Sequence, residues 1–130
     1  MGSQPEHILV VDDYSPHRNA VAFSLTKAGF RVSAAASPIK ALTLAQHEDF
    51  DLVITDYYMP DYAGSDLVKK LRENDKYTST PVILLTARAD ELNVEQLRDE
   101  LSVLVVPKPC STRHLVDIVA KCLAMARSGC

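Results

Sequence analysis

The sequence lacks the features of secreted, membrane-spanning and nucleic-acid-binding chains. Its only cysteines are Cys110, Cys122 and Cys130, and an odd number without paired spacing indicates reduced thiols in the cytoplasm. No apolar run is long enough to cross a bilayer, and no signal-peptide pattern opens the chain. Fourteen basic against seventeen acidic residues give a net charge of −3, so the basic excess of a nucleic-acid-binding surface is missing. These absences predict a cytoplasmic protein with no direct membrane insertion and no nucleic-acid binding through this domain.

The sequence does contain the material for one domain. Its 130 residues, 47% of them hydrophobic, suffice for a single core. We expect this domain over residues 6–127, between an N-terminal tail of residues 1–5 and a C-terminal tail of residues 128–130. The sequence leaves the oligomeric state open.

Short apolar runs alternate five times with stretches of helical periodicity. Continuous apolarity in short runs is typical of strands buried on both faces of a parallel sheet. Ser15 and Ser37 each place a capping hydroxyl before a proline suited to the first turn of a helix. The alternation predicts an α/β fold, a doubly wound (βα)5 flavodoxin-like sandwich with a five-stranded parallel sheet. The predicted strands are Ile8–Val11, Val32–Ala35, Leu52–Ile54, Val82–Leu85 and Val103–Val106.

Polar side chains stand at or just beyond the ends of four of these strands. Ligands of doubly wound sheets bind beyond the carboxyl ends of the strands, so we expect these side chains on one rim. Singly, each has an ordinary use: an Asp caps a turn or helix, a Thr suits a strand, and a Lys is a solvated loop charge. Their joint occurrence on one rim indicates a functional site. They are Asp12 and Asp13, Asp56, Thr86 and Lys108.

The three carboxylates predict a metal site. Carboxylates held close together repel one another, so the cluster costs stability unless a cation neutralises it. Oxygen ligands without His or Cys at ligand spacing favour Mg²⁺ over zinc, and Mg²⁺ accepts phosphate oxygens. Lys108 would add a charge and Thr86 a hydroxyl for the remaining phosphoryl oxygens. The set therefore fits phosphoryl transfer.

Five short motifs together resemble the response-regulator receiver domains of two-component and phosphorelay signalling. Each motif is weak alone, but their order and spacing are highly specific, and the resemblance covers nearly the whole chain. The motifs are Ile8-Leu9-Val10-Val11-Asp12-Asp13, Asp56-Tyr57-Tyr58-Met59-Pro60, Gly64, Thr86-Ala87 and Lys108-Pro109.

The resemblance implies that Asp56 accepts a phosphoryl group from a phosphohistidine. The donor would be a sensor histidine kinase or a His-containing phosphotransfer protein, docked beside the first helix near His17 and Arg18. Lys108 would contact the acyl phosphate, and the Thr86 hydroxyl would turn toward it after phosphorylation. Such a domain relays a two-component signal and assists its own phosphorylation and dephosphorylation, but it is not an enzyme with an independent substrate.

The resemblance also implies a set of Mg²⁺ ligands. Asp13, Asp56 and the backbone carbonyl of Tyr58 would bind the ion directly. Asp12 would support it through a water molecule.

The chain departs from the family pattern three residues before Lys108. Family members commonly carry Tyr or Phe there, and the ring turns inward when the Thr moves, whereas this chain has Val105. Valine is short and β-branched, with few rotamers, so it cannot make that movement. We therefore predict a small change on the face formed by the fourth helix, the last strand and the last helix.

Three other interpretations differ from this one in function. A haloacid-dehalogenase-type phosphatase needs an acidic residue two positions after its nucleophile, but Tyr14 stands there relative to Asp12. A flavodoxin-like cofactor protein needs a Ser/Thr/Gly loop for phosphate after the first strand, where Asp12 and Asp13 would repel it. A receiver-like domain that binds partners without phosphorylation stays open as the alternative, although such domains usually lose one of the acidic pair, the acceptor or the Lys.

Overall fold

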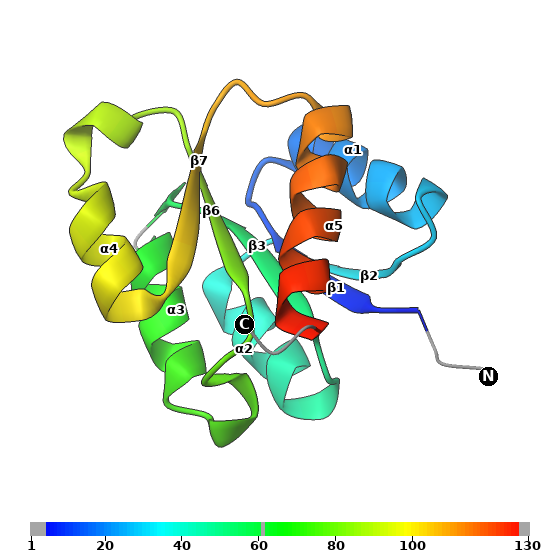
Figure 1. Ribbon diagram of the computed structural model, residues 1–130, viewed down its shortest axis with the longest axis horizontal. Coiled ribbons are helices and arrows are strands. Elements are labelled where there is room, and N and C mark those ends of the chain that lie inside the picture. The colour runs from blue at the N-terminus through cyan, green and yellow to red at the C-terminus, as the bar shows by residue number, and fades with distance from the viewer. Residues whose placement is uncertain (1–4, 61, 128–130) are drawn as a thin grey trace.

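The computed structural model describes residues 5–60 and 62–127 (Figure 1). Most of the two predicted tails, residues 1–4 and 128–130, therefore lies outside the described residues. Five parallel strands form one sheet in the order β2-β1-β3-β6-β7. The strands are β1 (His7–Val11), β2 (Arg31–Ala35), β3 (Leu52–Asp56), β6 (Val82–Thr86) and β7 (Val103–Pro107).

Helices cover both faces of this sheet. In Figure 1, α1 and α5 lie on one face, and α2, α3 and α4 lie on the other. The predicted doubly wound (βα)5 sandwich is thus confirmed. No helix among the described residues is long and apolar enough to span a membrane. The helices are α1 (Ser15–Lys27), α2 (Pro38–His47), α3 (Gly64–Arg72), α4 (Val94–Leu101) and α5 (Thr112–Arg127), with single 3₁₀ turns η1 (Asp75–Tyr77) and η2 (Ala89–Glu91).

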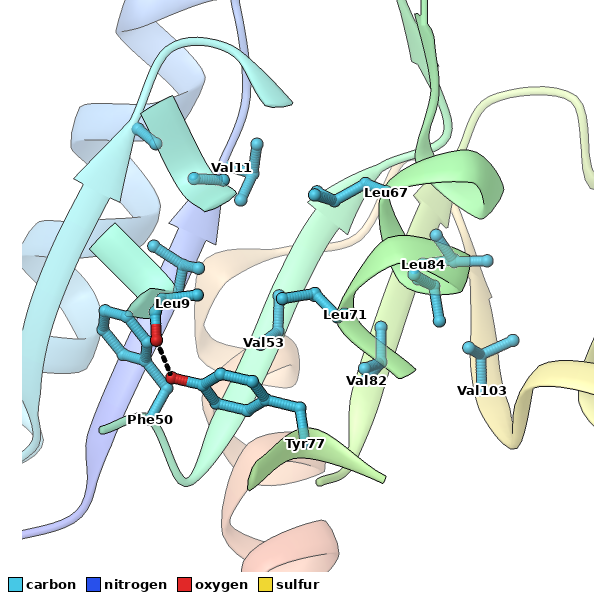
Figure 2. Close-up of a cluster of buried hydrophobic side chains, with 14 of the residues drawn as sticks. Leu9, Val11, Phe50, Val53, Leu67, Leu71, Tyr77, Val82, Leu84 and Val103 are labelled. Carbon is cyan, nitrogen blue, oxygen red and sulfur yellow. Dashed lines mark hydrogen bonds between the residues drawn. The ribbon is translucent and has the colours of Figure 1, made fainter. Parts of the chain in front are cut away.

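The core consists of two hydrophobic clusters, one on each face of the sheet. The three central strands, β1, β3 and β6, are buried along their whole length. Successive side chains of a strand point to opposite faces, so Leu9 joins the cluster beneath α2 and α3 while Ile8 joins the cluster beneath α1 and α5. Figure 2 shows the first cluster, in which Val53 and Leu84 of the sheet face Leu71 of α3.

The helix starts confirm one predicted cap and correct the other. The Ser37 hydroxyl accepts a hydrogen bond from the Lys40 N–H at 3.2 Å, as predicted. The prediction for Ser15 was wrong: this residue is already helical, and the N-cap is Tyr14, whose side chain makes no capping bond. The reason lies in the preceding loop, where the Tyr14 N–H donates to the Asp12 carboxylate at 2.9 Å and the helix starts one residue earlier.

A short antiparallel ribbon between β3 and α3 was not predicted. It pairs β4 (Tyr58–Met59) with β5 (Tyr62–Ala63). The ribbon holds the segment that follows the third strand close to the rim of the sheet.

Candidate functional site

The carboxyl ends of β1, β3, β6 and β7 bring the five predicted side chains to one rim. In the register of the sheet, Asp56 pairs with Leu85 and Thr86 pairs with Pro107, so the strand ends are level. One carboxylate oxygen from each of Asp12, Asp13 and Asp56 lies within 4.8 Å of the other two. The strands β3 and β6 run further than predicted, so Asp56 and Thr86 are the last residues of their strands. Strand pairing therefore fixes the backbone of both residues.

Asp56 is a buried carboxylate with an incomplete set of partners. Its Oδ1 lies 2.5 Å from the Lys108 Nζ. Apart from this ion pair, that buried oxygen has no hydrogen-bond partner among the described residues. Burial raises the pKa of the Asp56 carboxyl above its usual range, and the neighbouring charge of Asp12 adds to this, while Lys108 opposes it. Burial thus makes the charged form of Asp56 unfavourable, and a further cation beside the carboxylate would offset this cost in free energy.

Asp12 and Asp13 are adjacent in sequence but differ in their surroundings. Asp12 is buried, and its carboxylate accepts the Tyr14 N–H at 2.9 Å and contacts Nδ1 of His17. Its backbone carbonyl accepts a hydrogen bond from Nη1 of Arg18 at 2.9 Å. Asp13 is exposed. Both predicted docking residues of α1 therefore hold Asp12 in place, whereas Asp13 faces the solvent.

Thr86 and Lys108 are positioned by the pairing of β6 with β7. The Lys108 N–H donates to the Thr86 carbonyl at 2.7 Å, and the peptide bond from Lys108 to Pro109 is cis. The Thr86 side chain is buried, and its hydroxyl accepts a hydrogen bond from the Arg88 N–H at 3.0 Å. The ammonium and the hydroxyl thus belong to the same rim as the three carboxylates.

Gly64 closes the loop that follows Asp56. Its N–H donates to the Tyr57 carbonyl at 2.6 Å, and a Cβ at this position would lie 2.3 Å from the Asp56 carbonyl oxygen. No larger residue fits this approach. Glycine therefore lets the loop carrying Tyr58, whose carbonyl is a predicted ligand, fold against the end of β3.

The donor atoms of the rim fit a hard divalent cation. Three carboxylates contribute oxygen ligands within reach of one ion, and Oδ1 of Asp56 has only the ion pair with Lys108 among the described residues. Oxygen-only sites of this kind suit Mg²⁺, which keeps several of its waters. The residues present therefore match the predicted ion.

Comparison with known proteins shows the family. The response regulator receiver domain family matches residues 8–120. The chain belongs to this family. A two-component response regulator of rice, ORR11, is 34% identical over 83% of this chain and 74% of the rice protein. The hybrid signal transduction histidine kinase D of Dictyostelium discoideum is 31% identical over 93% of this chain and 8% of that protein.

Solved structures agree with this assignment. The chemotaxis response regulator CheY4 of Vibrio cholerae has 29% sequence identity and a TM-score of 0.81, covering 90% of this chain and 98% of that chain. This chain is therefore a receiver domain of two-component signalling.

Within this receiver domain, Val105, the predicted departure from the family pattern, lies on β7. Its side chain is half-buried and packs against the core cluster beneath α2 and α3. Tyr57 and Leu97 pack against the same cluster, and both are half-buried. Tyr57, which directly follows β3, is thus one of the aromatic residues that pack against this cluster.

Proposed function

We propose that this receiver domain takes a phosphoryl group from a phosphohistidine onto Asp56 in a Mg²⁺-dependent reaction and so relays a two-component signal. The observation that carries the proposal is the position of the Asp56 carboxylate. It is buried at the end of β3, beside two further carboxylates and 2.5 Å from the Lys108 ammonium. We place the domain at residues 6–127, in the cytoplasm.

In the proposed transfer, an oxygen of Asp56 attacks the phosphorus atom as the bond from phosphorus to the imidazole nitrogen breaks. The electron pair of that bond leaves with the imidazole. Lys108 stabilises negative charge on the phosphoryl oxygens, and the Thr86 hydroxyl turns to donate to one of them. Reaction with water later breaks the acyl phosphate, so the domain assists both steps without turning over an independent substrate.

The Mg²⁺ ligands in this proposal are Asp13, Asp56 and the Tyr58 carbonyl, with Asp12 acting through water. A bound ion would neutralise the carboxylates and offer positive charge to a phosphoryl oxygen. The contacts of Asp12 with α1 support its indirect role, because its carboxylate already binds the Tyr14 N–H and His17. The exposure of Asp13 supports its direct role.

The partner in this proposal is a sensor histidine kinase or a His-containing phosphotransfer protein. It docks beside α1, where His17 and Arg18 adjoin the site through Asp12. The resemblance to a hybrid histidine kinase supports a donor of this class.

Labelling by a small phosphodonor tests the proposal. Incubation with acetyl phosphate and Mg²⁺ should add one phosphoryl group to the wild type by intact mass, and EDTA should prevent it. Asp56→Ala should stay unlabelled, whereas Asp66→Ala, which removes an exposed carboxylate in the first turn of α3, should label like the wild type.

Two outcomes would count against the proposal. Equal labelling of Asp56→Ala and wild type would place the phosphoryl group elsewhere. An unlabelled wild type, with acetyl phosphate and with a histidine kinase, would favour a domain that binds partners without phosphorylation.

A further inference from the structure

Helix α4 is held on the sheet by few buried side chains. Leu101 is its one buried residue, and Leu97 and Val94 are only half-buried. The neighbouring helix α3 has five buried residues in nine. Elements with few buried apolar contacts are the ones that move at low free-energy cost. We therefore expect α4 to be the helix of this face that shifts most readily.

A cavity of about 320 Å³ lies between α3 and α4 and is also lined by Tyr57, the residue after Asp56. Its lining includes Ser65 and Lys69 of α3, Leu97 and Leu101 of α4, and Tyr57. The cavity thus links Tyr57, which follows the predicted acceptor, with α4, the helix of this face that has the fewest buried residues. Space of this size beside an aromatic ring allows the ring a second position.

Tyr57 has a fixed backbone and a side chain with room to move. Its N–H donates to the Leu85 carbonyl at 2.8 Å, and its carbonyl accepts the Gly64 N–H at 2.6 Å. Its ring is half-buried and meets the ring of Tyr58 edge-on, with 4.8 Å between centroids. Since side-chain rotation needs no change in these backbone bonds, the ring can leave Tyr58 and enter the cavity toward Leu97.

The position of Tyr57 in the sequence links it to both sides of the site. It stands between Asp56 and Tyr58, which in the proposed function both bind the same ion, one by its carboxylate and one by its carbonyl. Phosphorylation and ion binding would therefore reposition the residues on both sides of Tyr57. A coupling between sites needs an element with two arrangements that one site biases, and the Tyr57 ring meets that requirement.

We propose that the Tyr57 ring carries the state of Asp56 to α4 by moving between Tyr58 and the cavity that Leu97 lines. The proposal rests on the proposed phosphoacceptor role of Asp56. It replaces the expectation of a small change at α4 that Val105 suggested, and it keeps that expectation for β7 and α5. The aromatic side chain acts from the β3 side of α4 rather than from β7.

Nuclear magnetic resonance of the wild-type chain tests the movement directly. Beryllofluoride with Mg²⁺ stands in for the phosphoryl group. We expect amide shift changes at residues 12–14, 56–60 and 86–90 and along α4, with small changes along β7 and α5. Nuclear Overhauser effects between the Tyr57 ring and the Leu97 methyl groups should strengthen. A Tyr57 ring that stays beside Tyr58 would overturn the proposal whatever the variants do.

Variants of two half-buried tyrosines test the coupling. Tyr57→Leu should reduce the α4 shift changes at least about threefold, as expected for loss of a coupling element, while the changes at residues 12–14 and 86–90 persist. Tyr57→Phe should behave like the wild type. The matched control is Tyr62→Leu, because Tyr62 packs against the same cluster without lining the cavity, and it should keep the α4 response.

The outcomes separate this proposal from the function on which it rests. Amide shift changes at the site without changes along α4 would overturn the coupling and leave the phosphoacceptor role intact. Unchanged α4 shift changes in Tyr57→Leu would do the same. No response at residues 12–14, 56–60 and 86–90 overturns the phosphoacceptor role and the coupling together.

Discussion

Polar side chains lie at both ends of the sheet, but they differ in how completely they are hydrogen-bonded. At the amino end, Arg72 of α3 donates hydrogen bonds to four backbone carbonyls, at distances from 2.7 to 3.1 Å. The carbonyls belong to Tyr77, Thr80, Leu101 and Ser102, which precede β6 and β7. One guanidinium thus fixes the entry of two strands.

Several other polar groups at this end are paired as well. The His7 ring lies 2.9 Å from the Ser33 hydroxyl, which donates to Glu48 at 2.9 Å. The backbone N–H of His7 donates to the Asp51 carboxylate at 2.8 Å. The Tyr77 hydroxyl lies 2.7 Å from the carbonyl of Ala45, and Figure 2 draws this hydroxyl within the core.

The carboxyl end gathers three carboxylates and leaves one oxygen of Asp56 with only an ion pair. Buried polar groups are normally hydrogen-bonded, and exceptions concentrate where a ligand or a reaction completes them. The difference indicates that the amino end of the sheet stabilises the fold, while the carboxyl end keeps a less stable arrangement that fits the proposed phosphoryl transfer. Substitutions at the two ends should therefore have opposite effects on stability.

The largest effect on the free energy of unfolding is expected at the amino end of the sheet. Arg72→Ala should lower the free energy of unfolding by about 3 kcal/mol, because four carbonyls lose a charged donor. Urea unfolding measures the change. Arg98→Ala, which removes an exposed arginine of α4, should stay within about 0.5 kcal/mol of the wild type. If Arg72→Ala lost no more stability than Arg98→Ala, the amino end would not have the stabilising role that the comparison assigns to it.

A smaller loss is expected from the Tyr77 hydroxyl, which lies close to the carbonyls of Ala45 and Glu48. Tyr77→Phe should cost about 1 to 2 kcal/mol, since it keeps the ring and removes the donor from a buried acceptor. Thermal unfolding of this variant is best compared with Tyr14→Phe, because Tyr14 is exposed. Equal melting temperatures for the two variants would show that the hydroxyl contributes nothing.

The smallest effect, of opposite sign, is expected at Asp56. In EDTA at neutral pH, Asp56→Asn should raise the free energy of unfolding by about 1 kcal/mol, because it removes a buried like charge. Mg²⁺ should stabilise the wild type by mass action and the variant less. Asp66→Asn, an exposed site, serves as the control. Destabilisation by Asp56→Asn in EDTA would contradict the strained acidic cluster.

The pH dependence of stability gives a second test of Asp56→Asn against the wild type. The pKa of Asp56 is raised in the folded state, mainly by burial, so the folded chain holds a proton that the unfolded chain has already released. The contribution of Asp56 to the stability of the wild type therefore falls as pH rises from the usual aspartate pKa through the raised one. The advantage of Asp56→Asn should open over this window, persist at neutral pH and vanish in acid, as denaturant unfolding at several pH values would show.

Sequence reasoning succeeded where local pattern and topology are enough. Continuous apolar runs located the strands of the sheet within about two residues. The rule that parallel strands share a carboxyl edge predicted that Asp12, Asp56 and Lys108 lie on one rim. The convergence of the five side chains on that rim agrees with this prediction, while their chemical roles stay predictions.

Contacts between distant backbone groups escaped the sequence analysis. In the sequence, Arg72 resembles an ordinary solvated charge. Its four partners are backbone carbonyls, which every residue has, so no residue type in the sequence marks them. His17 was assigned only to the docking face, and its contact with Asp12 depends on how α1 leaves the rim. The ribbon of β4 and β5 has two residues in each strand, too few for any periodicity. In each case the signal lies in tertiary geometry.

The close approach of Gly64 to β3 leaves no room for a side chain between the first turn of α3 and the Asp56 carbonyl. The start of α3 and the end of β3 thus meet through backbone atoms alone. Any side chain at position 64 would have to displace either the Asp56 carbonyl or the first turn of α3, so the spacing between the strand and the helix depends on this one glycine.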